Sequence, residues 1–277
     1  MVRITSGILL LALITFMFFY SCGPKPPGEK PGVEEAAIPE ITGFTISTEE
    51  GNASFLWNTT RQKGETIGGY DIFMVPEGEN PGEPVKPLNE TPYPGDVDAD
   101  PTRETFKFSN AEPGKIYKTW VRLYSADGEN YVSSDTIIYS PVYKGQIVLN
   151  LRWSVRTSSY DFSRRSYVPA RSLDSDIMIM SGKGEPKIYS PNRMNDDFRR
   201  TVFADPGLKY EDLNIFNPES YDWQESLPLE RGNTYLMRTA DGHYAKLKCA
   251  RIEGEGGRLQ ATFIYCYIPA RGYYKFL

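Results

Sequence analysis

The sequence predicts an all-β protein. Apolar and polar residues alternate over many short segments, glycine and proline recur between these segments, and tyrosine is abundant. The chain of 277 residues contains 24 Gly, 21 Pro and 19 Tyr. Alternation with period two is typical of strands that bury one face, and Gly and Pro between such runs are typical of connecting turns. At roughly 100–200 residues per domain, the length fits two modest domains.

Composition narrows the class of function. The hydrophobic fraction is 40% and the aromatic fraction 13%, which is ample for packed cores. A net charge of −5 gives no reason to expect the basic patch of a nucleic-acid-binding protein. His243 is the single histidine of the chain, which removes most Ser-His-Asp and Cys-His arrangements and any multi-histidine metal site. We therefore expect a non-enzymatic protein without a cofactor and without a nucleic-acid partner.

Residues 1–21 have the pattern of a signal peptide. Arg3 precedes the apolar run Ile8–Tyr20, which has signal-peptide length and is shorter than the ~20 residues that cross a bilayer. The segment Phe19-Tyr20-Ser21-Cys22 resembles the lipobox of bacterial lipoproteins. The resemblance implies that Cys22 carries lipid, such as palmitate, and becomes the first residue. The alternative is an uncleaved anchor helix, and both place the protein on a membrane.

Residues 22–37 are predicted to be the lipidated cysteine and a disordered tether. The segment Gly23–Ala37 is rich in Pro, Gly and charge and nearly free of apolar residues, so it cannot fold alone. Proline favours an extended spacer at ~3.1 Å per residue. Gly23, where other lipoproteins have Asp, resembles lipoproteins sorted onward to the outer membrane. We therefore expect a lipid-anchored protein of the cell envelope.

Residues 38–143 are predicted to form a β-sandwich. In one segment Phe55 and Trp57 share a face, as a strand would place them. The range Pro76–Pro101 is a long stretch between two of the alternating segments, called the long insertion below. The alternating segments are Ile41–Ser47, Ala53–Asn58, Gly69–Val75, Thr105–Ser109, Ile116–Ser125 and Tyr131–Tyr139.

Three features of this region together resemble a fibronectin type III domain. They are Trp57 on an early strand, the entry Ile67-Gly68-Gly69-Tyr70, and the corner Pro113-Gly114 followed by Tyr117. The resemblance covers about 105 residues. It implies that Tyr117 is a tyrosine-corner residue whose hydroxyl bonds to the backbone upstream.

Residues 146–277 are predicted to form a second β-rich domain. It opens with a strand that alternates from Ile147 to Val155. Ser175–Met180 is predicted to be a buried strand, and Leu208–Phe216 a helical turn. The segments Thr234–Thr239, Tyr244–Ile252 and Leu259–Ile268 are predicted to form a three-stranded meander.

The meander places the two remaining cysteines near one another. Asp241-Gly242 is a type I′ turn signal that would pair Leu236 with Leu247. A two-residue turn within Glu253–Arg258 would put Cys249 and Cys266 on one face, opposite or diagonal to each other. The pair then forms a cross-strand disulfide, as exported proteins allow, or stays reduced and buried.

Other side chains suggest ligand chemistry. Asp96, Asp98 and Asp100 alternate as at the start of a calcium loop, although an EF-hand would not have Lys107 at the twelfth position. The alternative is a solvated acidic loop. A further possibility is sugar stacking on aromatic faces, for which the candidates are Trp223, Tyr265, Tyr267, Tyr273 and Tyr274.

The segment Gly232–Leu247 resembles the C-terminal hairpin of HmuY-like haem-binding lipoproteins, and Tyr160–Ser163 is similar to another stretch of that family. The resemblance implies haem ligands from His243 and from methionines, the candidates being Met178, Met180, Met194 and Met237.

We therefore expect an envelope lipoprotein that acts as a binding or adhesion module, with residues 146–277 as the recognition unit for a protein or glycan partner. The alternative is capture of haem or glycan by the same domain.

Overall fold

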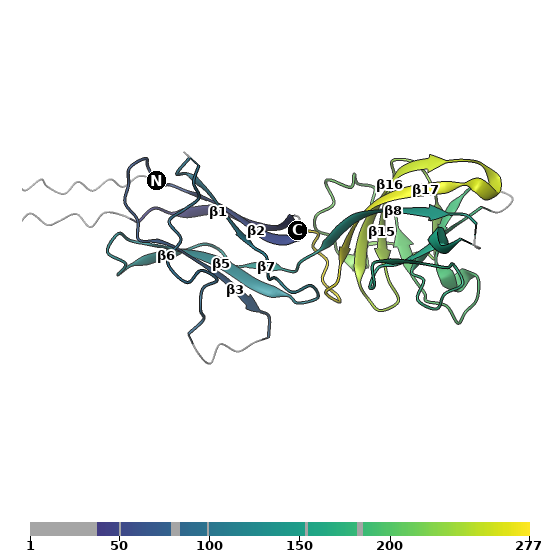
Figure 1. Ribbon diagram of the computed structural model, residues 1–277, viewed down its shortest axis with the longest axis horizontal. Coiled ribbons are helices and arrows are strands. Elements are labelled where there is room, and N and C mark those ends of the chain that lie inside the picture. Colours follow the sequence, from purple (N-terminus) through teal and green to yellow (C-terminus); the bar gives the residue numbers. More distant parts are fainter. Residues whose placement is uncertain (1–37, 50, 79–83, 99, 153–154, 182–184) are drawn as a thin grey trace, which may run out of the picture. The chain divides into compact units, whose positions relative to one another are not determined.

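The computed structural model describes residues 38–49, 51–78, 84–98, 100–152, 155–181 and 185–277. The predicted signal peptide, Cys22 and the tether lie outside these residues. Every regular element of the described part is a β-strand or a short 3₁₀ turn, which confirms the all-β prediction (Figure 1). Residues Ile38–Leu277 form one compact unit.

The strands from Ile41 to Tyr139 pair only among themselves, in two antiparallel sheets. One sheet has the order β1-β2-β4, and the other has the order β3-β5-β6 with β7 also pairing with β5. The bounds are β1 (Ile41–Glu49), β2 (Asn52–Thr59), β3 (Gly69–Pro76), β4 (Arg103–Phe108), β5 (Tyr117–Tyr124), β6 (Tyr131–Ser133) and β7 (Ile137–Tyr139). The predicted segment Tyr131–Tyr139 is thus two short strands.

A core of alternating residues fills the space between these two sheets. Phe55 and Trp57 are fully buried, and the Trp57 ring lies edge-on to Tyr70 with 5.2 Å between centroids. The described part of the long insertion follows β3, because Leu88 N–H donates to the Ile72 carbonyl and Tyr93 pairs with Tyr70. The insertion therefore covers the free edge of β3, which limits edge-to-edge association.

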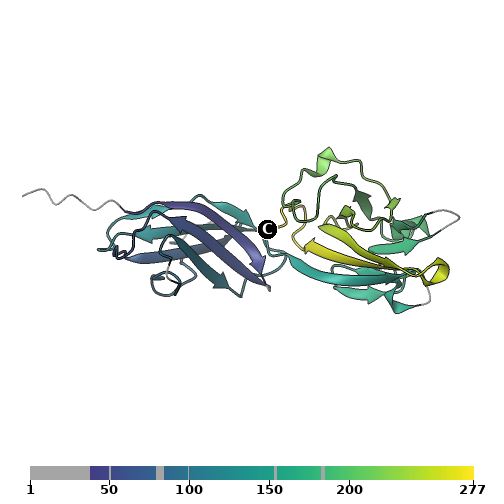
Figure 2. The same ribbon diagram turned by 90° about the horizontal axis from the view of Figure 1, so that it is seen from above.

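The strands from Tyr143 onward form two further antiparallel sheets (Figure 2). The first, called the central sheet, has the order β13-β15-β16-β17-β8, and the second, called the short sheet, has the order β10-β9-β11-β12-β14. The central sheet consists of β8 (Tyr143–Asn150), β13 (Val202–Ala204), β15 (Thr234–Arg238), β16 (Tyr244–Glu253) and β17 (Gln260–Ile268). The short sheet consists of β9 (Ser159–Asp161), β10 (Ser166–Val168), β11 (Ile177–Met180), β12 (Lys187–Tyr189) and β14 (Ser226–Pro228).

Four 3₁₀ turns complete the regular structure: η1 (Arg156–Ser158), η2 (Pro191–Arg193), η3 (Pro218–Ser220) and η4 (Gly256–Arg258). Leu208–Phe216 contains no helix, so the helical turn predicted there is wrong. The predicted buried strand is present as β11. The predicted opening strand is present in part as β8, with Ile147 and Leu149 facing the core, but it ends at Asn150, and Leu151, Arg152 and Val155 are not in a strand.

The central sheet is buried on its inner face and on part of its outer face, which leaves Ile264 of β17 38% exposed. Its inner face packs against the short sheet through side chains such as Phe203, Met237 and Phe263. Its outer face carries a second apolar cluster, in which Leu236 and Tyr244 are covered by Phe216 and Phe276 from irregular segments. A strand that is buried on both faces loses the simple inward–outward alternation of a half-exposed sheet.

The first hairpin of the meander has a different register from the predicted one. Thr239 N–H donates to the His243 carbonyl, so three residues, Ala240 to Gly242, connect β15 to β16. Gly242 has φ +85°, as the last residue of such a three-residue connection requires. Leu236 consequently lies opposite Lys246 rather than opposite Leu247. A shift of one residue moves every following side chain to the other face, which places Leu236 on the outer face.

Candidate functional site

Tyr117 makes the hydrogen bond that a tyrosine corner requires. Its hydroxyl accepts the Glu112 N–H at 2.9 Å, while the ring is buried in the core that contains Trp57. The backbone contact predicted for Tyr117 is therefore confirmed. Tyr117 and Trp57 stabilise the first sandwich, and neither residue lines a cavity described below.

A second tyrosine corner occurs in the following sandwich and was not predicted. The Tyr235 hydroxyl accepts the Glu230 N–H at 2.9 Å and donates to the Pro228 carbonyl at 2.9 Å. The two corners share the pattern Glu-x-Gly-x-x-Tyr, with Gly114 and Gly232 both at positive φ. This repeated pattern is visible in the sequence and could have identified the second corner.

The structure contradicts the Cys249–Cys266 disulfide. Both cysteines are free and buried, with Cys249 opposite Phe263 and Cys266 opposite Lys246. Near the turn that joins them, β16 and β17 keep one of the predicted registers. A β-bulge between Cys249 and Arg251 then shifts the pairing by one residue. Cys249 therefore faces the inner core and Cys266 the outer cluster. Burial raises the pKa of each thiol to about 11.

The structure also contradicts the calcium alternative for the acidic loop. Asp96 accepts the Asp98 N–H at 3.2 Å, and Asp98 accepts the Asp100 N–H at 2.7 Å. Asp100 in turn accepts the Thr102 N–H at 3.0 Å. The carboxylates follow one another along the loop as Asx turns instead of converging. Among the residues that the structure describes, no cluster of three His, Cys, Asp or Glu side chains can hold a metal ion.

The haem ligands implied by resemblance are not brought together. Met237 lies in the inner core opposite Ala245, and Met178 is fully buried on β11. The His243 ring bonds through Nδ1 to the Tyr267 hydroxyl. Neither His243 nor a methionine lines any of the cavities described below.

Two adjoining cavities lie over the outer face of the central sheet and share Trp223 and Arg238. We call them together the Trp223 groove. The first cavity has a volume of about 470 Å³ and the second about 430 Å³. The first is lined by aromatic and polar side chains, among them Asn217, Glu219, Tyr221, Trp223, Tyr244 and Tyr274. The second is lined by Arg200, Val202, Trp223, Arg238, Thr239, Ala240 and Gly242.

Trp223 is held in a fixed orientation within this groove. Its indole N–H donates to the Pro218 carbonyl at 2.7 Å, which satisfies the polar edge of the ring within the protein. Its ring packs against Tyr221 at 6.3 Å and Tyr244 at 6.2 Å between centroids. The Arg238 guanidinium lies over the ring, 5.3 Å from the centroid. A ligand in either cavity would therefore meet a preorganised aromatic surface.

The structure divides the predicted sugar-stacking aromatics into two groups. Trp223 and Tyr274 line the groove, and Tyr274 is 44% exposed. The other three, Tyr265, Tyr267 and Tyr273, are buried and cannot present a ring face to a ligand. Sequence reasoning missed Tyr221, Tyr244 and Arg238, of which only Tyr221 could have been noticed, since it alternates with Trp223.

A third cavity of about 510 Å³ lies beside Tyr210 on the same domain. Tyr210 is the only aromatic residue that lines it. Two of its charged groups, Lys248 and Glu211, already pair with each other at 2.7 Å. We therefore assign the candidate site to the Trp223 groove.

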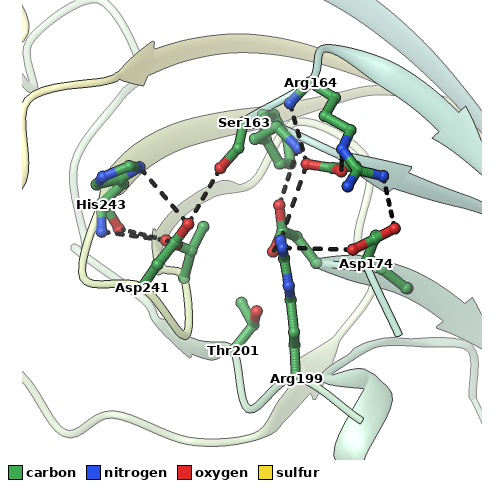
Figure 3. Close-up of polar contacts among 12 residues, drawn as sticks. Ser163, Arg164, Asp174, Arg199, Thr201, Asp241 and His243 are labelled. Atoms are coloured by element: carbon green, nitrogen blue, oxygen red, sulfur yellow. Dashed lines mark hydrogen bonds and ion pairs between the residues drawn. The ribbon is translucent and has the colours of Figure 1, made fainter. Parts of the chain in front are cut away.

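A buried carboxylate network lies outside the groove, around Arg199 (Figure 3). Asp161 and Asp176 are fully buried, and the Arg199 guanidinium lies 3.8 Å and 3.1 Å from them. Arg199 also reaches the partly exposed Asp174 at 3.7 Å, and Arg164 donates to Asp174 at 2.6 Å. The arginine thus occupies the position between the carboxylates that a cation would otherwise take.

Burial raises the pKa of Asp176 to about 7, although the N–H of Phe162 and the charge of Arg199 oppose the rise. The N–H of Phe162 donates to Asp176 at 2.8 Å. The neighbouring carboxylates raise the pKa of Arg199 despite its partial burial. A carboxyl group with this pKa gains or loses its proton near neutral pH.

Three further polar residues, Ser163, Asp241 and His243, lie toward the hairpin turn that joins β15 to β16, as labelled in Figure 3. The Ser163 hydroxyl donates to Asp241 at 3.1 Å, while His243 Nδ1 contacts the Tyr267 hydroxyl. Burial raises the pKa of Asp241, but hydrogen bonding from Thr239 and the charge of His243 lower it below its usual value on balance. In a catalytic triad the serine would contact the histidine. Here Ser163 contacts Asp241 instead, so the three side chains do not have the order of contacts of a triad.

No protein-family model matches the chain, and a search of the curated proteins gives no match. Within the described residues, no helix is long and apolar enough to span a membrane.

Proposed function

We propose that this protein is a lipid-anchored envelope protein that binds carbohydrate in the Trp223 groove without catalysing a reaction. The observation that carries the proposal is the groove itself, in which Trp223, Tyr221 and Tyr274 accompany Asn217 and Glu219. Sugar rings offer apolar faces and many hydroxyl groups. Aromatic rings match the faces, and amide and carboxylate oxygens match the hydroxyls.

The size of the groove supports a small ligand of one or two sugar units in each cavity. Cavities of ~300–1,000 Å³ are typical of small-molecule sites. The open, polar character of the groove suits a glycan better than haem, which needs a deep apolar cleft and axial ligands. Its fixed indole also suits sugar stacking, because the ligand does not have to order the aromatic residue on binding.

The location is the second part of the proposal. The signal-peptide pattern, Cys22 and the Pro-rich segment support a lipid anchor followed by a spacer. In this proposal the chain contacts a membrane through its lipid at one end and a glycan at the other. In this proposal the fibronectin type III-like sandwich is a further spacer, and the outer membrane is the compartment. The first sandwich supports that role through its packed core, Trp57 and Tyr117 included.

A glycan array tests the binding proposal. The chain from residue 23 onward contains every described residue and lacks only the signal peptide and the lipidated cysteine. We expect it to bind a subset of glycans, and Trp223→Ala and Tyr274→Ala to lose the signal. Tyr131→Ala is a matched control, because Tyr131 is 53% exposed but lies on β6, outside the groove. Absence of any Trp223-dependent signal would refute carbohydrate binding.

Metabolic labelling with an alkyne-tagged palmitate tests the anchor. We expect label on the full chain in the membrane fraction and none on Cys22→Ser. Cys266→Ser is the control for nonspecific thiol acylation, because Cys266 is buried. Equal labelling of the native chain and Cys22→Ser would refute lipidation at Cys22.

A further inference from the structure

We infer that the glycan bound by the Trp223 groove is acidic, and that the second cavity takes its carboxylate. This inference rests on the proposed function, because it assigns the chemical class of ligand to the same groove. Two arginines, Arg238 and Arg271, carry the argument through their position and their lack of carboxylate partners.

Arg238 is the last residue of β15 and projects over the outer face of the central sheet beside Trp223. It lines both cavities, so a ligand that occupies either one meets its guanidinium. In the part of the chain that the structure describes, Arg238 forms no ion pair. Its contact is the indole ring, and such stacking leaves the donor edge of the guanidinium free to bind an anion.

Arg271 does not line the second cavity itself but lies against the hairpin turn whose residues Thr239, Ala240 and Gly242 do. A Cβ atom on Gly242 would lie 3.1 Å from its Nε, so the side chain packs directly on the turn backbone. The N–H of Gly272 donates to the Gly242 carbonyl at 3.2 Å and ties the C-terminal segment to the same turn. Across the described residues, Arg271 too has no carboxylate within ion-pair distance.

The neighbouring arginines show what is unusual about these two. Arg199 contacts three carboxylates, and Arg200 pairs with Glu225 at 2.7 Å. Their charges are therefore already compensated within the protein. Arg238 and Arg271 are not compensated in this way, and a planar guanidinium matches a carboxylate through two parallel hydrogen bonds.

The acidic side chains of the groove give the ligand a direction. Glu219 lines only the first cavity, and no carboxylate is among the residues that line the second. A negatively charged group would be repelled in the first cavity and attracted in the second. We therefore place a sugar ring on the aromatic first cavity and the acidic group of the glycan near Arg238 and Arg271.

Oligogalacturonate and its methyl ester test this inference, because esterification removes the charge and keeps the sugar. Titration calorimetry on the chain from residue 23 onward should show binding of the acid about tenfold tighter than binding of the ester. Arg238→Gln and Arg271→Gln should each remove most of this difference. Arg251→Gln is the matched control, because Arg251 pairs with Glu253 at 2.6 Å and lies near the end of β16 that is remote from the Gly242 turn.

The outcomes separate this inference from the proposed function. Equal affinities for the acid and the ester, both lost in Trp223→Ala, would overturn the acidic ligand and leave carbohydrate binding intact. If neither oligogalacturonate nor its methyl ester binds, the glycan array tests whether the ligand is acidic. Trp223-dependent signals on acidic glycans support the inference, and signals confined to neutral glycans overturn it. An array without any Trp223-dependent signal overturns both.

Discussion

The buried carboxyl of Asp176 should make the protein less stable as the pH rises, opposite to the behaviour of an ordinary aspartate. Burial raises its folded-state pKa to about 7, whereas an exposed aspartate titrates near 4. Between these two pH values the folded state holds a proton that the unfolded state has lost. The free energy of unfolding therefore falls as the pH rises from about 4 to about 7 and is constant above this range.

The size of the effect follows from the two pKa values. One pH unit of difference corresponds to about 1.4 kcal/mol, so the full change is about 4 kcal/mol. Asp176 is 0% exposed, so solvent does not screen this penalty. For a chain of this size, 4 kcal/mol corresponds to a change in Tm on the order of 10 °C.

Urea unfolding of the chain from residue 23 onward, followed by Trp fluorescence from pH 4 to pH 8, measures this slope. Asp176→Asn stays neutral at every pH and can still accept the Phe162 N–H, so it should lose the slope. Asp174→Asn is the matched control, because Asp174 contacts the same arginine but its side chain is 35% exposed. If Asp176→Asn kept the native slope, or if the native protein gained stability relative to Asp176→Asn as the pH rose, the carboxyl would be ionised and our reasoning wrong.

Three further predictions concern the two tyrosine corners, the two cysteines and the acidic loop. Tyr235→Phe should lower the free energy of unfolding by about 2 kcal/mol and Tyr117→Phe by about 1 kcal/mol. The reason is that Tyr235 makes two backbone hydrogen bonds and Tyr117 makes one. Equal losses of the two variants in urea unfolding would contradict this ranking. Cys249 and Cys266 should react with a maleimide only in denaturant, and a mass change on reduction of the native protein would show a disulfide instead. Excess calcium should leave Tm unchanged in the native protein and in Asp98→Asn, and a rise confined to the native protein would restore a metal site.

Local sequence patterns predicted the longer strands, because each of them buries at least one face over enough residues for the alternation to be visible. The three-residue strands β9, β10, β12, β13 and β14 were not predicted. Phe55 and Trp57 alternate within β2, and Ile147 and Leu149 alternate within β8, so the period of two appears directly in the sequence. The corner at Tyr117 was predictable for a similar reason. Its pattern is local, since the hydroxyl and its partner lie five residues apart.

The registers were not predictable from the same patterns. A three-residue connection after Thr239 and a bulge after Cys249 each shift a hairpin by one residue. Neither feature has a distinctive composition, because Asp241-Gly242 fits both a two-residue and a three-residue turn. The consequence was large for Cys266, which moved from the predicted face to the opposite one.

The groove was only partly predictable because its residues come from separate irregular segments. Trp223 and Tyr274 could be proposed as aromatic candidates from their type. The irregular segment around Trp223 has no periodicity that indicates which ring is exposed. Arg238 sits at a strand end, where a sequence pattern predicts only solvent exposure. The irregular segments that cover the outer face of the central sheet bring these three residues together.

Lys246 explains how that covering layer is held in place. Its position between Ala245 and Leu247 on β16 reads as the solvent side of a strand, yet the side chain is buried. An irregular segment buried against a sheet leaves carbonyl groups without partners, and each such group is costly unless it is hydrogen-bonded. Lys246 Nζ donates to the carbonyls of Tyr210 and Leu213 at 2.9 Å and 2.8 Å.

Burial lowers the pKa of Lys246, which is the expected cost of placing an ammonium group there. The bonded carbonyls and the ring of Tyr210, 4.5 Å from Nζ, offset that cost. The segment fixed in this way leads directly to Phe216, which packs on the outer face, and then to Trp223. A lysine in the middle of a strand therefore belongs to the scaffold of the groove, because it anchors the segment that presents the indole ring.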